Sequence, residues 1–291
     1  MEIGGHGKRF MSNSSGVRVS EIKTKDEQLG DLPKGLSFFD PLLRHEVIEA
    51  LEAGGEAFIS RNSEGEKNGL FIYDSYEATG TIFTKSREVF DHFYLLKPSS
   101  YIFSEFEVAE HPKEVWNIWQ MDVDKAPLNH RFKHHVSMDR NVREIERFMA
   151  STQPGTNRQW VGVALRNGDK CFVVRIADRI VGIAWMTIVG GVARSHSLYV
   201  EPQFRRMGIM RDNLQARLIY LKSRHVHTLI NEIAESNIAS SSHAAKAGER
   251  IVGKIFLYTS PDHNARAPMK TPGTGLTGSR HRLCRTDESL V

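Results

Sequence analysis

The segment Leu198–Leu214, LYVEPQFRRMGIMRDNL, has the residue types of a phosphate-binding turn. An apolar strand ends at Val200, Pro202 stops it, and an amphipathic helix follows. Gly208 precedes that helix and has no side chain, so backbone amides can approach a ligand closely. A helix N-terminus offers unpaired N–H groups and partial positive charge, to which the arginines of the turn add formal charge. The segment predicts a pyrophosphate site, and the alternative is an ordinary surface loop that enters a helix.

Regular strands and helices surround this turn and must position it. The predicted elements, in chain order, are strands at 171–176, 180–188 and 192–200, a helix at 211–224, a strand at 228–234, a helix at 237–247 and a strand at 251–258. This order predicts an α/β fold of the α+β type, with a mixed sheet and helices packed on it.

Two motifs in this region resemble those of the GNAT superfamily of acyl-CoA-dependent N-acyltransferases. In that family a strand ends in Val-x-Pro and the next helix begins with Arg-x-x-Gly-x-Gly/Ala. Here Val200-Glu201-Pro202 is followed by Arg205-Arg206-Met207-Gly208-Ile209-Met210. A second family landmark is an Asn, then a helix that closes on Lys-x-Gly, and it is matched by Asn237, Lys246 and Gly248. The resemblance covers the C-terminal half of the chain with the motifs in the right order.

The resemblance implies an acetyl-CoA site. Strands 192–200 and 228–234 should part, and the pantetheine arm should lie in the opening beside the first strand. Amides of the turn should hold the pyrophosphate, and Asn237 should contact pantetheine or fix the helix that follows. The cofactor-binding residues that it implies are Leu198, Tyr199, Val200, Arg205, Arg206, Met207, Gly208, Ile209, Met210, Arg211 and Asn237, and no metal is expected.

The chain departs from the family pattern at three positions. Met210 stands where the family usually has Gly or Ala, and Glu249 replaces the usual aromatic residue after the last glycine. Ala244 occupies the position of the tyrosine that often serves as general acid.

Glu232 is the predicted catalytic residue. Acyl transfer to an amine needs a proton acceptor, and relatives such as ribosomal-protein N-terminal acetyltransferases place a catalytic Glu five residues before the Asn. Because Glu232 lies in a mostly apolar strand, partial burial would favour such a role. The alternative is a glutamate that faces solvent. Weaker candidates are Glu235, His243, Tyr199 and His196.

The rest of the chain divides by composition. Residues 1–34 are predicted to be a disordered leader, and residues 261–291 a flexible basic tail. Residues 35–110 read as a small α/β domain, with a degenerate GNAT-like copy as one alternative, since the segment contains no Arg-x-x-Gly-x-Gly/Ala. Residues 111–260 form the predicted N-acetyltransferase domain.

The composition excludes several classes of protein. Of 291 residues, 40% are hydrophobic and 25% are charged, which is typical of globular proteins. No apolar run approaches the roughly 20 residues of a membrane span, and the first ten residues have no apolar signal region. Two distant cysteines predict neither a disulfide framework nor a metal site, and therefore favour the cytoplasm.

Three functions are compatible with the sequence. The first is an N-acetyltransferase that moves an acetyl group from acetyl-CoA to an amine of a small molecule or protein. The second is a non-catalytic acyl-CoA-binding module, which the missing tyrosine favours. The third, a nucleic-acid-associated protein with a basic tail, is disfavoured because the formal net charge is only +4. No membrane partner is expected, and a homodimer stays an open alternative.

Overall fold

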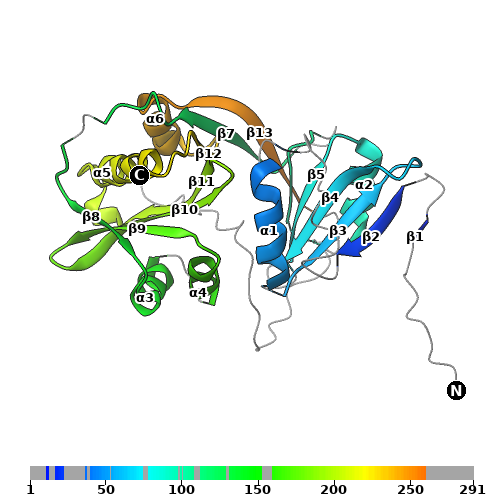
Figure 1. Ribbon diagram of the computed structural model, residues 1–291, viewed down its shortest axis with the longest axis horizontal. Helices are drawn as coiled ribbons and strands as arrows, with labels where there is room; N and C mark the ends of the chain where they lie inside the picture. Colours follow the sequence, from blue (N-terminus) through cyan, green and yellow to red (C-terminus); the bar gives the residue numbers. More distant parts are fainter. Residues whose placement is uncertain are drawn as a thin grey trace, which may run out of the picture. The chain divides into compact units, whose positions relative to one another are not determined.

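The computed structural model of the chain describes residues 11–12, 17–22, 37, 40–52, 54–74, 78–97, 99, 101–107, 112–128, 131–152 and 159–259 (Figure 1). The predicted tail at 261–291 lies outside the described residues, as does most of the predicted leader. The fold is mixed α/β, as the sequence predicts. The described residues form two compact units, one with residues up to Glu114 and Ile255–Thr259, the other with Val115–Lys254. No helix in the described ranges is long and apolar enough to cross a membrane.

The first unit contains a sheet and two helices. Its strands are antiparallel neighbours except for the parallel pair β5–β6, and β6 also pairs antiparallel with the end of β13 (Arg250–Thr259). In sheet order the other strands are β1 (Met11–Ser12), β2 (Arg18–Ile22), β3 (Glu56–Arg61), β4 (Lys67–Asp74), β5 (Thr79–Thr84) and β6 (Tyr101–Ser104).

Helices α1 (Asp40–Glu52) and α2 (Arg87–Leu96) cover opposite faces of this sheet. Leu70 of β4 packs in one cluster with Val47 of α1, whereas the neighbouring Phe71 meets Phe93 of α2 at a ring distance of 5.6 Å. Successive strand residues point to opposite faces, so both faces of β4 are apolar and buried. A small α/β domain is predicted for residues 35–110, and this unit contains both helices and strands there.

Strand β2 lies within residues 1–34, the predicted leader. It pairs antiparallel with β3, from Arg18 opposite Arg61 to Ile22 opposite Ala57, and its Val19 and Ile22 side chains are buried. The segment is too short and polar to show strand periodicity by itself. Pairing with a longer, apolar strand provides its stability.

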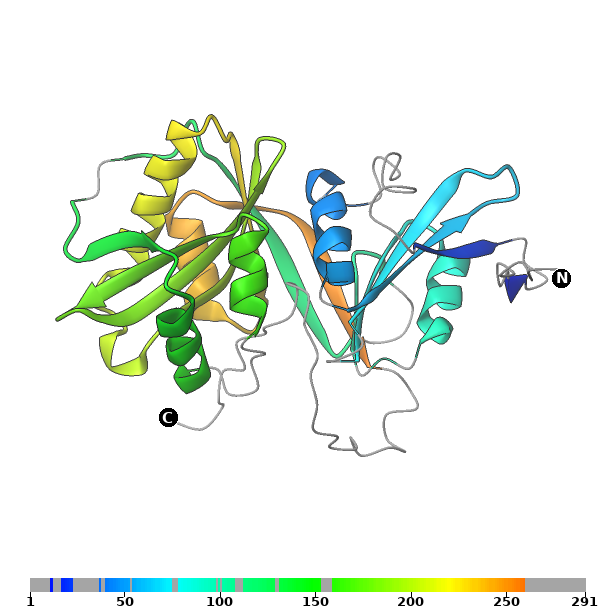
Figure 2. The same cartoon turned by 60° about the horizontal axis from the view of Figure 1, so that its bottom comes forward.

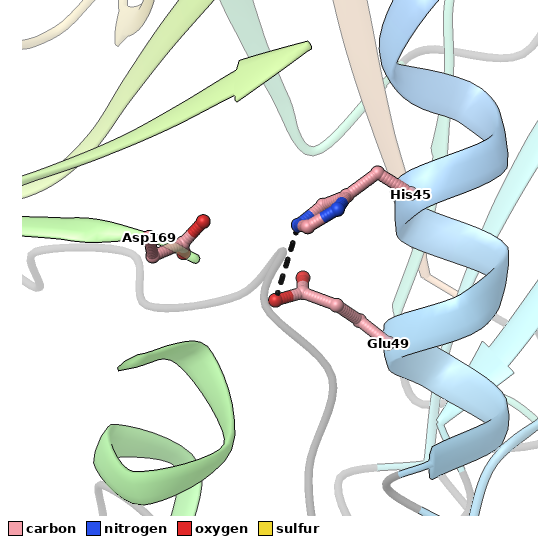
Figure 3. Close-up of side chains that lie close together, drawn as sticks. All are labelled: His45, Glu49 and Asp169. Carbon is pink, nitrogen blue, oxygen red and sulfur yellow. Dashed lines mark ion pairs between the residues drawn. The ribbon is translucent and has the colours of Figure 1, made fainter. Parts of the chain in front are cut away.

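Two polar side chains lie one turn apart on α1. His45 Nε2 is 3.5 Å from Glu49 Oε1, and the Glu49 side chain is only 2% exposed (Figure 3). The i, i+4 spacing places both on one face of the helix.

The second unit is a seven-stranded sheet with helices on both faces (Figure 2). Its strand order is β13-β7-β12-β11-β10-β9-β8, where β11 and β12 are parallel. The strands are β7 (Glu114–Asp122), β8 (His135–Asp139), β9 (Lys170–Ile176), β10 (Arg179–Val189), β11 (Val192–Val200), β12 (Thr228–Ala234) and β13. The helices are α3 (Val142–Thr152), α4 (Gln159–Arg166), η2 (Pro202–Phe204), α5 (Ile209–Ser223) and α6 (Ile238–Lys246).

Each face of this sheet has its own core. Phe172 of β9 packs with Leu214 and Leu218 of α5, whereas Val173, the next residue, packs with residues of α3 and α4 such as Trp160. Trp185 is fully buried in the second cluster. The predicted strand and helix order is confirmed here, with two additions. Strand β8 and helix α4 were not assigned from the sequence, since each is short and flanked by polar residues.

Strand β13 belongs to both units. Its residues up to Lys254 lie in the second unit, and Ile255–Thr259 lie in the first, where Phe256–Thr259 pair with β6. The division into domains at 35–110 and 111–260 stays a prediction.

Arg175 of β9 ties α3 to the sheet. Its guanidinium binds Asp139 at the end of β8 and reaches Glu144 of α3, with Nη2 2.9 Å from Glu144 Oε2. The hydrogen bond from Arg175 lowers the pKa of Glu144. A carboxyl whose pKa is lowered on folding stabilises the fold above its unfolded pKa, and this contribution is lost as the pH falls.

We therefore expect Arg175→Met to destabilise the protein by about 1–2 kcal/mol at pH 7, because two carboxylates lose charged hydrogen bonds. The difference from wild type should shrink as the pH falls below the ordinary Glu value of 4.5. Thermal unfolding at several pH values measures both effects. Arg166→Met, at the end of α4, is a control of the same type. A difference that is constant with pH would show that Arg175 contributes packing rather than charge.

Candidate functional site

Strands β11 and β12 part in the middle of the sheet and form a fork. Their parallel pairing runs from Val192 opposite Thr228 to Ser195 opposite Asn231 and ends there. Beyond this point β11 stays paired with β10, and β12 stays paired with β7. The predicted separation of the two strands is confirmed.

A β-bulge in β11 coincides with the start of the fork. On the β10 side, Trp185 pairs with His196 and Ile183 with Tyr199, so two residues of β11 stand opposite Ala184. Ser197, inside the bulge, has a φ of 49°. A bulge bends a strand and increases its twist, which turns the end of β11 away from β12.

The predicted pyrophosphate turn connects β11 to α5. Gly208 caps the helix with a φ of 92°, in the left-handed region that favours glycine, and a Cβ there would meet nothing within 4 Å. The N–H groups at the start of α5 point along its axis toward the turn, and those of Arg211 and Asp212 donate to the Gly208 carbonyl oxygen. Arg205 is held by its own loop, since its Nε donates to the Val200 carbonyl oxygen at 3.2 Å. The turn thus presents amides and positive charge to the end of the fork.

The start of α5 lies against the sheet because Gly182 of β10 has no side chain. A Cβ there would lie 2.8 Å from Ile209 Cγ2, closer than carbon atoms can pack. Ile209 is buried with Val181 and Val200. A side chain at Gly182 would push the first turn of α5 outward.

Asp212, in the first turn of α5, anchors the segment before β8. Its side chain is fully buried and accepts a hydrogen bond from the His134 backbone at 3.0 Å, and His134 Nδ1 lies 2.6 Å from Oδ2. Asp212 was not among the residues singled out from the sequence. An acidic side chain in the first turn of a helix predicted to bind an anion is the feature that could have drawn attention to it.

The structure places Asn237 as the N-cap of α6. Its Oδ1 accepts a hydrogen bond from the Ser240 backbone at 3.1 Å. Of the two predicted roles, contact with pantetheine or fixing the helix, the second is present. Ala244 of α6, at the position of the family's tyrosine, is buried and offers no hydroxyl.

Glu232 forms a two-pronged ion pair with Arg194 at the start of the fork. Arg194 Nε lies 2.9 Å from Oε1 and Nη2 2.8 Å from Oε2. The Arg194 side chain is 4% exposed and that of Glu232 is 17% exposed, so the pair is largely desolvated. The sequence analysis did not identify Arg194, because nothing local in β11 reveals which residue of β12 it faces.

Buried polar side chains contact the last paired residues of β11 and β12, where the fork begins. Arg217 of α5, 2% exposed, donates to Ser195 Oγ at 2.5 Å and to Asn213 Oδ1 at 3.0 Å. Asn231 donates to Glu249 Oε2 at 2.6 Å. Burial lowers the pKa of Arg217 to about 10 and raises the pKa of Glu249. Both residues of the last β11–β12 pair are therefore fixed by side chains from outside the two strands.

His243 of α6 lies in a setting that favours its neutral form. Burial lowers its pKa, and the positive charges of Arg217, Arg211 and Lys246 lower it further. Its Nε2 is buried without a hydrogen-bond partner among the described residues. Cys171 is also a poor nucleophile, because burial raises the pKa of its thiol.

The parted strands and the glycine-capped helix after them agree with the family assignment of the sequence. Residues 138–248 match the Acetyltransferase (GNAT) family. The C-terminal half of this chain contains a GNAT domain. No curated protein matches the chain.

Solved structures support the fold of the GNAT domain and its surroundings. A GCN5-related N-acetyltransferase from Sphaerobacter thermophilus is 12% identical, with a TM-score of 0.51, over 69% of this chain and 79% of that one. A Drosophila protein from structural genomics is 11% identical, with a TM-score of 0.58, over 80% of this chain and 94% of that one. A tandem GNAT protein from the clavulanic acid biosynthesis pathway is 11% identical, with a TM-score of 0.50, over 71% of this chain and 83% of that one. At these identities the likeness concerns the fold alone.

The expected cofactor residues gather around the end of β11 and the start of α5, with Asn237 at the start of α6. Their contacts with acetyl-CoA remain predictions.

We expect Gly208→Asp to weaken acetyl-CoA binding at least tenfold, or ~1.4 kcal/mol, because a carboxylate would stand against the pyrophosphate. Calorimetry measures the affinity. Gly191→Asp is the matched control, since Gly191 also has a positive φ, of 81°, and open space, but lies in the β10–β11 turn. Equal affinity of both variants and wild type, with an intact fold, would refute the site.

Proposed function

We propose that the GNAT domain transfers an acetyl group from acetyl-CoA to a primary amine by direct attack of the amine on the thioester. The observation that carries this proposal is the fork between β11 and β12, which opens beside the glycine-capped start of α5. A fork between two strands, with a glycine-capped helix start at its end, suits an extended, pyrophosphate-containing donor. Acetyl-CoA would supply the activated acyl group.

Residues of this chain would hold the donor in three places. Leu198 and Val200 would pair their backbone with the pantetheine amides, as an added strand does. The amides of Arg206 to Arg211 would bind the pyrophosphate, and the arginine side chains would neutralise it. The side-chain-free surface at Gly208 leaves room for this approach.

Glu232 is our proposed general base. Beside its ion pair with Arg194, the Glu232 carboxylate would accept a hydrogen bond from the neutral acceptor amine. It would take up one proton as the amine attacks. Arg194 would hold the carboxylate in one orientation at the mouth of the fork.

A cytoplasmic location accompanies this proposal. Acetyl-CoA as donor and a free, buried thiol at Cys171 both fit a reducing compartment. The acceptor is an amine of a small molecule or of a protein.

A non-catalytic acyl-CoA-binding module is the second candidate. Ala244 at the tyrosine position and the engagement of both Glu232 oxygens by Arg194 favour it. A screen of amines with acetyl-CoA, read by release of the free CoA thiol, separates the two. Turnover with at least one amine supports the transferase, whereas tight acetyl-CoA binding without turnover supports the binding module.

With an acceptor found, we expect Glu232→Gln to lower kcat about a hundredfold, the usual scale for loss of a general base. Acetyl-CoA affinity should stay unchanged, because the carboxylate is not a phosphate ligand. The wild-type rate should fall in acid as the base is protonated, and the variant should lose this acidic limb.

Glu235→Gln is the control for this experiment. Glu235 lies at the end of the same strand, half-exposed and paired with Lys254 at 3.0 Å. If Glu232→Gln keeps kcat within a few-fold of wild type and retains the acidic limb, Glu232 is not the general base, and its role is limited to the ion pair with Arg194.

A further inference from the structure

We propose that Ser197, His196 and Asp169 form a proton relay that protonates the leaving CoA thiolate, in the role that Ala244 cannot fill. This inference rests on the proposed acetyl transfer. All three residues belong to the second unit, and two of them lie at the start of the fork.

The distances align the three side chains in one row. His196 Nδ1 lies 3.4 Å from Ser197 Oγ, and Nε2 lies 3.4 Å from Asp169 Oδ2 and 3.3 Å from Thr187 Oγ1. The imidazole thus has a hydroxyl on one nitrogen and a carboxylate on the other. Figure 3 shows Asp169, which immediately precedes β9.

Burial separates the two ends of this row. The Asp169 side chain is 1% exposed and that of His196 is 8% exposed, whereas Ser197 is half-buried. The Asp169 carboxylate therefore lies at the buried end of the row, next to the imidazole. The hydroxyl end is the one that a substrate can reach.

Two tryptophans fix the orientation of the imidazole ring. Trp185 stacks on His196 at 6.5 Å between ring centroids with a plane angle of 21°, and Trp160 meets it edge-on at 5.8 Å. A ring held on two sides cannot turn its nitrogens away from their partners. A histidine that only filled space would need no such alignment with a hydroxyl and a carboxylate.

Ser197 is placed by strain. Its φ of 49° is uncommon for a residue with a side chain, and such conformations persist where the surrounding structure imposes them. Here the bulge imposes it. The bulge places Ser197 two residues beyond Ser195, the last residue of β11 that pairs with β12, where the thioester would enter the fork.

The proton balance of the step is complete. The amine attacks the carbonyl carbon and gives one proton to Glu232, and the C–S bond then breaks with its electron pair on sulfur. The thiolate takes the Ser197 Oγ proton, and Ser197 takes the Nδ1 proton of the imidazolium. His196 becomes neutral, with its remaining proton on Nε2. Solvent removes the proton of Glu232 and returns one to His196.

Among the described residues of this unit, side chains from β10, from α4 and from the residue before β9 lie next to the His196 ring. Asp169 meets the ring itself, while β10 and α4 present the uncharged Thr187, Trp185 and Trp160. Arg194, two residues back on β11, is paired with Glu232 of β12.

The test uses the full chain with the amine acceptor found above. His196→Gln and Ser197→Gly should each lower kcat about tenfold to a hundredfold. Glycine tolerates the positive φ, so the second variant removes the hydroxyl without adding strain. KM for the amine and calorimetric acetyl-CoA affinity should stay unchanged. A group that must be protonated produces the alkaline limb of the pH–rate profile, and His196→Gln should lose that limb while keeping the acidic one.

Asp169 is a positioning residue, and its variant needs a different readout. Asp169→Asn should shift the alkaline limb of kcat to lower pH, since the imidazolium loses its counter-charge. At pH values below this limb, kcat of the variant should equal that of wild type. His243→Gln, a buried histidine of α6, is the control that should change neither limb.

Four outcomes would overturn the relay. They are unchanged kcat in His196→Gln with an intact fold, loss of the acidic instead of the alkaline limb, full activity in Ser197→Gly, and an acetyl group found on Ser197 by mass spectrometry. A wild type that binds acetyl-CoA but turns over no amine removes the proposed function, and the relay with it. Wild-type turnover that His196→Gln retains overturns the relay alone.

Discussion

The end of the β11–β12 ladder at Ser195 and Asn231 is the constraint on which the functional part of the molecule depends. Inside a sheet, each strand satisfies its backbone N–H and C=O groups through its neighbours, and groups left without partners are costly. Here β10 and β7 hold the outer edges of the two strands, so the inner edges can separate without unfolding the sheet. An extended ligand with amide groups can then take the place that a strand would have taken.

The opening is maintained by elements on both sides of the sheet. On the α5 side, Arg217 and Glu249 reach Ser195 and Asn231, the last paired residues. A buried charged group contributes little net stability, because desolvation offsets its attractions. We interpret this network as a means of fixing where the strands part. Arg194, in the paired part of β11, also binds Glu232, the first residue of β12 beyond the ladder.

Local patterns explain which parts of this architecture the sequence predicts. Gly208, the preceding arginines and the amphipathic helix lie within one short segment, and each acts through its own backbone or the next turn. The Arg194–Glu232 pair and the Asp212–His134 contact join residues 38 and 78 positions apart. Such pairs depend on strand register and helix placement, which no single-segment pattern contains. Strand β2 was missed for the same reason, since its order comes from β3.

The division of β13 between the units has a consequence for synthesis of the chain. Tyr258 donates to the Phe106 carbonyl oxygen, 152 residues earlier, and Phe256–Thr259 complete the edge of β6. Contacts so distant in sequence form slowly, because a long loop must close first. On the ribosome, the N-terminal sheet keeps an exposed edge at β6 until the whole acetyltransferase domain has been translated. A strand edge exposed for that time is a natural target for chaperones and for mispairing between nascent chains.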